Sequence, residues 1–214
     1  MCYYYNVAMQ RYIAEQRFMA EFNGDDWDFP TGLVNGFSLP SMPLILDERP
    51  DIITTGQWGL IPGWAAAKEP KDFIKTANTL NAMIETVDTK PAFRNYTDQR
   101  CLVLAQSFQE WKHTVVGKKT VKTPYNIRVP GDKPFAMAGI YSVINGVPTY
   151  SILTTAANSL MAEIHNSKKR MPVILLPEEE KLWLQRDKLE PYHNRTEVEL
   201  VAISLGEPGQ ESLF

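Results

Sequence analysis

The residue with the clearest chemical potential is Cys2, which directly follows Met1. Once Met1 is removed, Cys2 carries an α-amine and a thiol on one carbon frame. Their unperturbed pKa values are about 7.7–8.0 and about 8.5, so a useful fraction of each group is reactive near neutral pH. Such a 1,2-aminothiol suits aldehydes, because the amine forms a Schiff base and the thiolate then closes a thiazolidine ring. A cysteine also falls at this position by chance, and alone it is a weak indication.

Glu110 and His165 are the candidate proton-transfer groups, since each is expected at the end of a strand or helix. A carboxylate, or an imidazole that titrates near neutrality, can move the protons that imine formation requires. The residues alone favour simpler roles: a solvated hairpin residue for Glu110 and a helix-end cap for His165.

Trp58 and Trp64 lie six residues apart around a Gly/Pro turn. Two indole rings so placed can present flat faces for stacking on nucleic-acid bases. Tryptophan in a loop-rich segment more often anchors the loop to the core, and the residues alone favour that interpretation.

These side chains must be positioned by an α+β fold with a mostly antiparallel, barrel-like β core and several short helices. Asn145-Gly146, between apolar runs, predicts a tight hairpin, and Gly117-Lys118 predicts a second one. Apolar spacing predicts two amphipathic helices, the second with Asn81 near its middle. The helices are expected over 10–22, 72–87 and 158–165 and from Pro177; the strands are expected over 42–46, 52–55, 101–105, 111–116, 120–129, 135–144, 147–155, 171–176 and 200–205.

The 214 residues, with 44% hydrophobic and 22% charged residues, are typical of one globular domain. We expect this domain over residues 1–205 and a flexible tail over 206–214. No apolar run approaches the length of a membrane span, and the first residues do not resemble a signal peptide, so we expect a cytoplasmic protein. Two cysteines predict neither a disulfide framework nor a metal-binding spacing.

The formal charge of −3 argues against a protein that coats nucleic acid by bulk charge. Two local basic clusters remain, Lys168-Lys169-Arg170 and the group of Lys118, Lys119 and Lys122. We interpret the second as a solvated loop.

Taken together, the motifs resemble those of the SOS response-associated peptidase (SRAP) family, over roughly residues 1 to 185. The order of the motifs is more specific than any one of them. They are Met1-Cys2, Trp58 to Trp64, Asn81-Ala82 with Glu85-Thr86, Pro91 to Arg94, Arg100 to Val103, Phe108 to Trp111, Ala138 to Tyr141, Thr154 to Asn158, Ile164-His165 and Arg170 to Leu175.

The resemblance implies a DNA-damage protein that binds single-stranded DNA and captures abasic sites covalently. Cys2 would be the nucleophile and Asn81 would hold its amine or the sugar. Glu110 would assist Met1 removal and proton transfer, and His165 would act on the ring-opened sugar. Trp58, Trp64, Phe93 and Arg94 would line the DNA groove. Neither a metal nor a cofactor is implied, and a monomer is expected.

The chain departs from the family pattern in three places. Tyr3-Tyr4 stands where the family commonly has Gly-Arg, and Met83 replaces a common arginine. Four residues, in place of the usual one, separate His165 from Arg170. Lys168 and Lys169 belong to that insertion, and we expect them to supply phosphate contacts beside Arg170.

The last residues suggest a partner. Gln210, Leu213 and Phe214 resemble the short motif by which bacterial repair proteins dock to the sliding clamp. Docking of Leu213 and Phe214 on their own domain is an equally good interpretation.

Two other functions remain open. The first is a cysteine peptidase acting on other proteins, with Cys2, His165 and either Glu110 or Asn81. The second is a noncatalytic DNA- or clamp-binding module in which Cys2 is inert.

Overall fold

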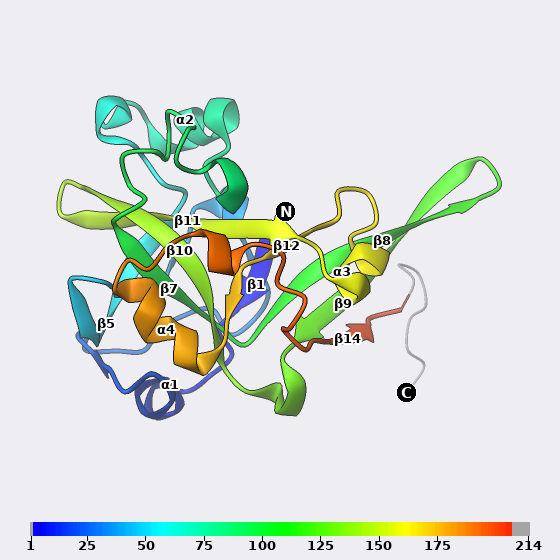
Figure 1. Ribbon diagram of the computed structural model, residues 1–214, viewed down its shortest axis with the longest axis horizontal. Helices are drawn as coiled ribbons and strands as arrows, with labels where there is room; N and C mark the ends of the chain where they lie inside the picture. Colours follow the sequence, from blue (N-terminus) through cyan, green and yellow to red (C-terminus); the bar gives the residue numbers. More distant parts are fainter. Residues whose placement is uncertain (1, 207–214) are drawn as a thin grey trace.

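The computed structural model describes residues 2–206 and shows an α+β fold built on a closed barrel (Figure 1). The barrel strands are β4 (Ser41–Leu46), β5 (Arg49–Trp58), β7 (Arg100–Ala105), β10 (Phe135–Ile144) and β11 (Val147–Ala156). Neighbouring strands pair antiparallel, and a short parallel pairing of β11 with β5 closes the ring. The expected barrel-like core is confirmed.

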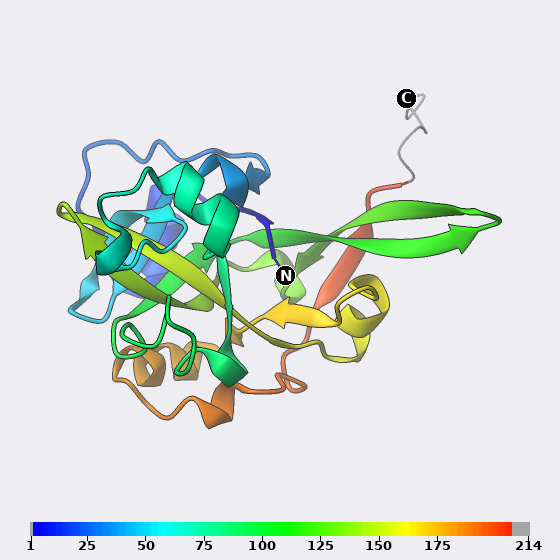
Figure 2. The ribbon, with the colours of Figure 1, turned by 90° about the horizontal axis from the view of Figure 1, so that it is seen from above.

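A second sheet leans against the barrel and carries a long arm (Figures 1 and 2). Its strand order is β14 (Val201–Ser204), β9 (Lys119–Arg128), β8 (Ser107–Val116), β1 (Tyr4–Asn6) and β3 (Val34–Asn35). The outer half of the β8–β9 hairpin projects away from the body. β1 therefore lies at the junction of the barrel and the arm.

Both predicted hairpins are present. Asn145 and Gly146 have φ angles of 51° and 79°, and Gly117 has a φ of 61°, which are the positive values that tight turns need. The expected third helix is α3 (Ser159–Ile164), and the Pro177-initiated helix is α4 (Pro177–Leu184).

The first two expected helices are too long. α1 (Arg11–Phe18) ends where Met19 turns left-handed, and Glu21–Phe22 instead forms β2 beside β5. α2 (Pro70–Ala77) ends at Asn78, whose φ is 44°. Asn81 is therefore not inside a helix.

The chain after α2 is extended. β6 (Asn81–Met83) runs parallel to β11, with Asn81 opposite Ile152. The apolar run expected as one strand over 171–176 instead forms two short strands, of which the first pairs with β11 and the second with β10. The remaining elements are β12 (Arg170–Pro172), β13 (Ile174–Leu175) and the short 3-10 turns η1 (Gly36–Ser38), η2 (Gly63–Ala65), η3 (Ile84–Thr86), η4 (Pro130–Asp132) and η5 (Glu190–Tyr192).

Within residues 2–206, no helix is long and apolar enough to cross a membrane. The clamp-motif residues Gln210, Leu213 and Phe214 lie outside the described residues, and docking to a clamp stays a prediction.

Candidate active site

The pairing of β1 with β8 places Cys2 near the base of the arm. Tyr5 pairs with Phe108 and Asn6 pairs with Ser107 in the antiparallel β1–β8 ladder. Continuing this register by two residues brings Tyr3 opposite Glu110, so the nucleophile and the carboxylate lie at one end of β1.

Asn81 holds Cys2 from the barrel side. Its Nδ2 donates a hydrogen bond of 2.9 Å to the Cys2 carbonyl oxygen. Its Oδ1 is also buried and has no hydrogen-bond partner among the described residues. An unused acceptor is costly to bury, and this one lies next to the backbone of the nucleophile.

The Cys2 side chain is fully buried, and its Sγ donates to the Tyr4 carbonyl oxygen at 3.5 Å. Burial raises the pKa of the thiol well above its ordinary value, and the negative charge of Glu110 raises it further. The resting sulfur is therefore a thiol near neutral pH.

Glu110 is 4% exposed, on β8. Burial raises the pKa of this carboxyl from 4.5 to about 7, because the anion loses its hydration. The solvated hairpin role suggested by the residues alone is wrong, and both protonation states are available at neutral pH.

His165 lies at the C-terminal end of α3, and hydrogen bonds hold this end of the helix in place. The Asn158 side chain caps the helix by accepting from the Met161 amide at 3.0 Å. Asn166 then ties the following turn to β8, with bonds of 3.1 and 2.8 Å to the amide and carbonyl of His113. His165 Nδ1 lies 2.8 Å from the Arg170 carbonyl oxygen, so this nitrogen carries the proton.

The imidazole therefore turns Nε2 toward the carboxylate. His165 Nε2 lies 3.8 Å from Glu110 Oε2. Burial lowers the pKa of His165, so the ring is neutral at pH 7 and its Nε2 can accept a proton. Both side chains line a cavity of about 330 Å³, together with Tyr4, Trp111, His113, Lys122 and Ser167.

The basic run beside His165 divides in two. Lys168 and Lys169 are exposed, as expected for phosphate contacts. Arg170 instead forms a two-pronged ion pair with Glu85, at 2.9 and 2.8 Å. Because the Glu85 carboxylate balances the charge of Arg170, this side chain has a structural role here and is not a free phosphate ligand.

The predicted groove residues also divide. Trp64 is 61% exposed and shares a cavity of about 400 Å³ with Phe93 and Asn81. Arg94 is exposed nearby in sequence, after Phe93. Trp58 does not fit the groove, because its ring is fully buried and its Nε1 donates to the Leu80 carbonyl at 2.9 Å. The core-packing interpretation is correct for Trp58.

Several site residues escaped the sequence analysis. Glu85 was noted only within a motif, although its carboxylate holds Arg170. Asn166 carried no signal, because an asparagine after a short helix has many roles. Tyr3 and Tyr4 were noted only as departures from a family pattern, yet they border the cavities on either side of Cys2.

Comparison with known proteins identifies the family of the chain. The sequence model of the family described as SOS response associated peptidase (SRAP) matches residues 1–204. The abasic site processing protein YoqW of Bacillus subtilis is 43% identical over 141 residues, which cover 63% of this chain and 58% of YoqW. The abasic site processing protein HMCES of Xenopus tropicalis is 27% identical over 154 residues, covering 60% and 43%. The matched segments thus span less than two thirds of these relatives.

Solved structures show the same fold over nearly the whole chain. A crystal structure of a protein from Bacteroides thetaiotaomicron superposes with a TM-score of 0.82 at 30% identity, covering 96% of this chain and 92% of the other. One from Bordetella bronchiseptica superposes with a TM-score of 0.74 at 22% identity, covering 96% and 100%, and supports the fold alone.

Proposed function

The chain belongs to the SOS response associated peptidase (SRAP) family, and from this premise we propose that it captures abasic sites in single-stranded DNA through Cys2 after loss of Met1. The observation that carries the proposal is that three buried polar side chains lie at the end of β1 that Cys2 precedes. Asn81 binds the Cys2 backbone, and Glu110 and His165 face each other in the adjoining cavity. The names of the relatives support abasic-site processing as the reaction class.

The proposed reaction uses the open form of the abasic sugar, which is an aldehyde at C1′. The Cys2 amine attacks this carbon, and the resulting carbinolamine loses water to give an imine. The sulfur then bonds to the same carbon while the thiol proton passes to the nitrogen. Aminothiol and aldehyde together lose one water, so the atoms balance without an oxidant or reductant.

Each buried side chain has a role that its environment supports. The unused Oδ1 of Asn81 accepts a hydrogen bond from the freed amine. Glu110, partly protonated near neutral pH, donates the proton that leaves with water. Neutral His165 takes the proton of the C1′ hydroxyl at Nε2, since its Nδ1 is committed to Arg170, and passes it to the ring oxygen O4′ as the C1′–O4′ bond breaks.

DNA would reach this site along the exposed side chains around it. Trp64 offers aromatic surface beside the buried ring of Phe93, and Arg94, Lys168 and Lys169 offer positive charge. Base stacking contributes about 1–3 kcal/mol per base, so a net negative chain can still bind a single strand.

A peptidase acting on other proteins is the weaker alternative. A cysteine nucleophile in that chemistry is a thiolate kept ready by a neighbouring base. Here burial and Glu110 both raise the pKa of the Cys2 thiol. The site therefore suits attack by an amine first and by sulfur second.

Intact mass spectrometry tests the proposal. Protein that has lost Met1 is incubated with a single-stranded oligonucleotide carrying one abasic site. The expected product has the summed mass minus one water, and it is absent in Cys2→Ala. Cys101→Ala is the matched control, because it removes the other buried thiol and should leave capture intact.

Two results overturn the proposal. An adduct that persists in Cys2→Ala assigns the chemistry to another residue. No adduct from the processed wild-type protein favours the noncatalytic binding module.

A further inference from the structure

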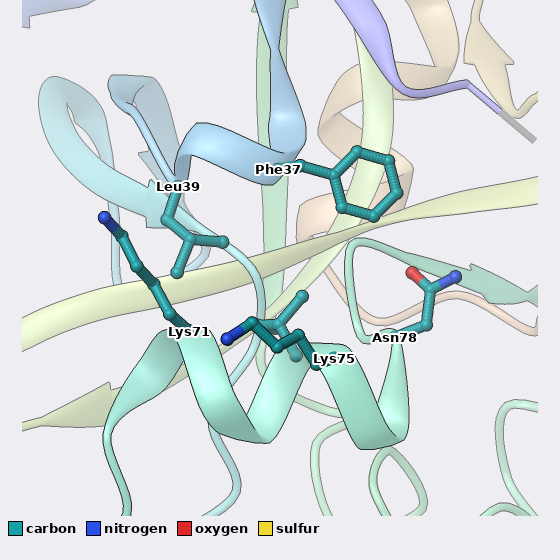
Figure 3. Close-up of a pocket in the computed structure, with 6 residues that line it drawn as sticks. Phe37, Leu39, Lys71, Lys75 and Asn78 are labelled. Carbon is teal, nitrogen blue, oxygen red and sulfur yellow. The ribbon is translucent and has the colours of Figure 1, made fainter.

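A second cavity lies next to Tyr3, the residue that follows Cys2. It is a largely apolar cavity of about 400 Å³ between η1 and one face of α2 (Figure 3), which we call the Phe37 groove. Its lining consists of Phe37, Leu39, Lys71, Ile74, Lys75 and Asn78. It is distinct from the cavities lined by Glu110 and by Trp64.

Tyr3 connects the Phe37 groove to the active site. Its ring lies 4.9 Å from the Phe37 ring, tilted by 37°, and its hydroxyl accepts a hydrogen bond of 2.9 Å from Asn78. Successive side chains of an extended strand point to opposite sides. Tyr4 accordingly packs on Trp111, at the cavity of Glu110. The residue after Cys2 thus leads directly into the Phe37 groove.

Phe37 is held in an exposed position. The side chain is 51% exposed, although the turn that carries it is well fixed. Asn35 accepts from the Phe37 amide at 3.0 Å, and Ser38 donates to the Asn35 carbonyl at 2.7 Å. A fixed, half-exposed ring beside a second ring is the arrangement on which a nucleobase stacks.

Two lysines line the α2 side of the Phe37 groove. Lys71 and Lys75 are four residues apart on α2, so they lie on the same face of the helix. Figure 3 shows Lys71 beside Leu39 and Lys75 on the helix below Leu39. Lys75 also pairs with Asp72 at 3.1 Å, but both side chains are more than 70% exposed, and such a pair is weak enough to exchange for a phosphate.

We propose that the Phe37 groove seats the nucleotide next to the abasic site. The base stacks on Phe37 at the Tyr3 edge, and the backbone phosphates lie against Lys71 and Lys75. The inference rests on the proposed function, because the strand enters the groove from the abasic sugar at Cys2.

The test measures noncovalent DNA binding and combines two changes: removal of one base from the DNA and truncation of the Phe37 side chain in the protein. The probes are single-stranded oligonucleotides with a stable tetrahydrofuran abasic analogue and one neighbouring base removed, on either side in turn. Removing the stacked base should weaken wild-type binding about 5- to 140-fold, which corresponds to stacking of about 1–3 kcal/mol. In Phe37→Ala, removal of the same base should change the binding affinity little, because the base no longer has a ring on which to stack.

The lysines are tested by salt. Lys71→Ala with Lys75→Ala should lower the slope of log affinity against log salt by about 1.4, which is the loss of two phosphate contacts on a single strand. Tyr12→Ala, an exposed aromatic on α1, and the pair Lys181→Ala with Lys188→Ala are matched controls that should bind as wild type.

The outcomes separate this inference from the proposed function. If the wild type captures abasic DNA but base removal costs the same in Phe37→Ala, the groove assignment is overturned and the function stands. If the wild type captures nothing, yet the base effect depends on Phe37, the function fails and the groove remains a single-strand site.

Discussion

Replacing Glu110 with glutamine should change how stability depends on pH. Burial raises the pKa of this carboxyl from 4.5 to about 7, so the folded chain keeps a proton that the unfolded chain has released in this range. Stability therefore falls as pH rises from 4.5 toward 7. At 1.36 kcal/mol for each pH unit, the cost approaches about 3 kcal/mol above pH 7. Glutamine has nearly the same shape and carries no such cost.

Urea denaturation followed by tryptophan fluorescence measures the effect. The stability of Glu110→Gln minus that of the wild type should grow by about 3 kcal/mol between about pH 4.5 and pH 8. Glu15→Gln is an informative control, because Arg11 holds the pKa of Glu15 below its usual range, at 2.8 Å. The stability difference between that variant and the wild type should change only below about pH 4.5 and stay nearly constant between about pH 4.5 and pH 8. Parallel pH profiles for Glu110→Gln and the wild type would refute the assignment of Glu110 as a carboxyl titrating near pH 7.

Three further predictions concern the framework of the site, and urea denaturation checks each of them. Gly139→Ala should lose about 1–3 kcal/mol, because its Cβ would lie 2.7 Å from Cys101 Sγ and 2.9 Å from Val103; an unchanged midpoint would mean that the barrel relaxes there. Asn158→Ala should lose about 1 kcal/mol with the cap of α3, and Asn158→Asp should keep the cap but lose the hydrogen bond that Asn158 Nδ2 donates to the buried Val198 carbonyl. Glu85→Gln should lose about 1–2 kcal/mol because the two-pronged pair with Arg170 is partly buried, whereas Asp72→Asn, in an exposed pair, should lose less than about 0.5 kcal/mol.

Local patterns predicted the β framework well. The Asn145-Gly146 turn allows few conformations other than a hairpin, and the structure contains it. The helix expected over 72–87 was too long because two periodicities coincide in its second half. Leu80 and Ile84 continue a helical spacing from Phe73, but Leu80, Ala82 and Ile84 also alternate, as in a strand. The left-handed turn at Asn78 and the ladder to β11 select the strand.

The reacting groups of the proposed site were predictable from residue types and family resemblance, but their surroundings were not. The family resemblance placed Trp58 in the DNA groove, and the packing shows instead that Tyr5 and Tyr150 lie against its ring. Arg170 looked like a phosphate ligand, whereas Glu85, distant in sequence, balances its charge. Phe37 belongs to none of the motifs, because its position depends on a turn that meets Tyr3 only in three dimensions.

Strand β11 positions the residues that flank the turn after His165. Asn81 pairs with Ile152, and Arg170 pairs with Ala156, four positions farther along the same strand. The Asn81 amide and the carbonyl that orients His165 are therefore positioned by two ladders on one strand, β11, which rises about 3.3 Å per residue. The insertion closes on itself, with the Lys169 amide donating to the His165 carbonyl at 2.8 Å. A longer turn can thus display Lys168 and Lys169 without moving the imidazole, because the register of β12 on β11, and not the length of the turn, determines where Arg170 lies.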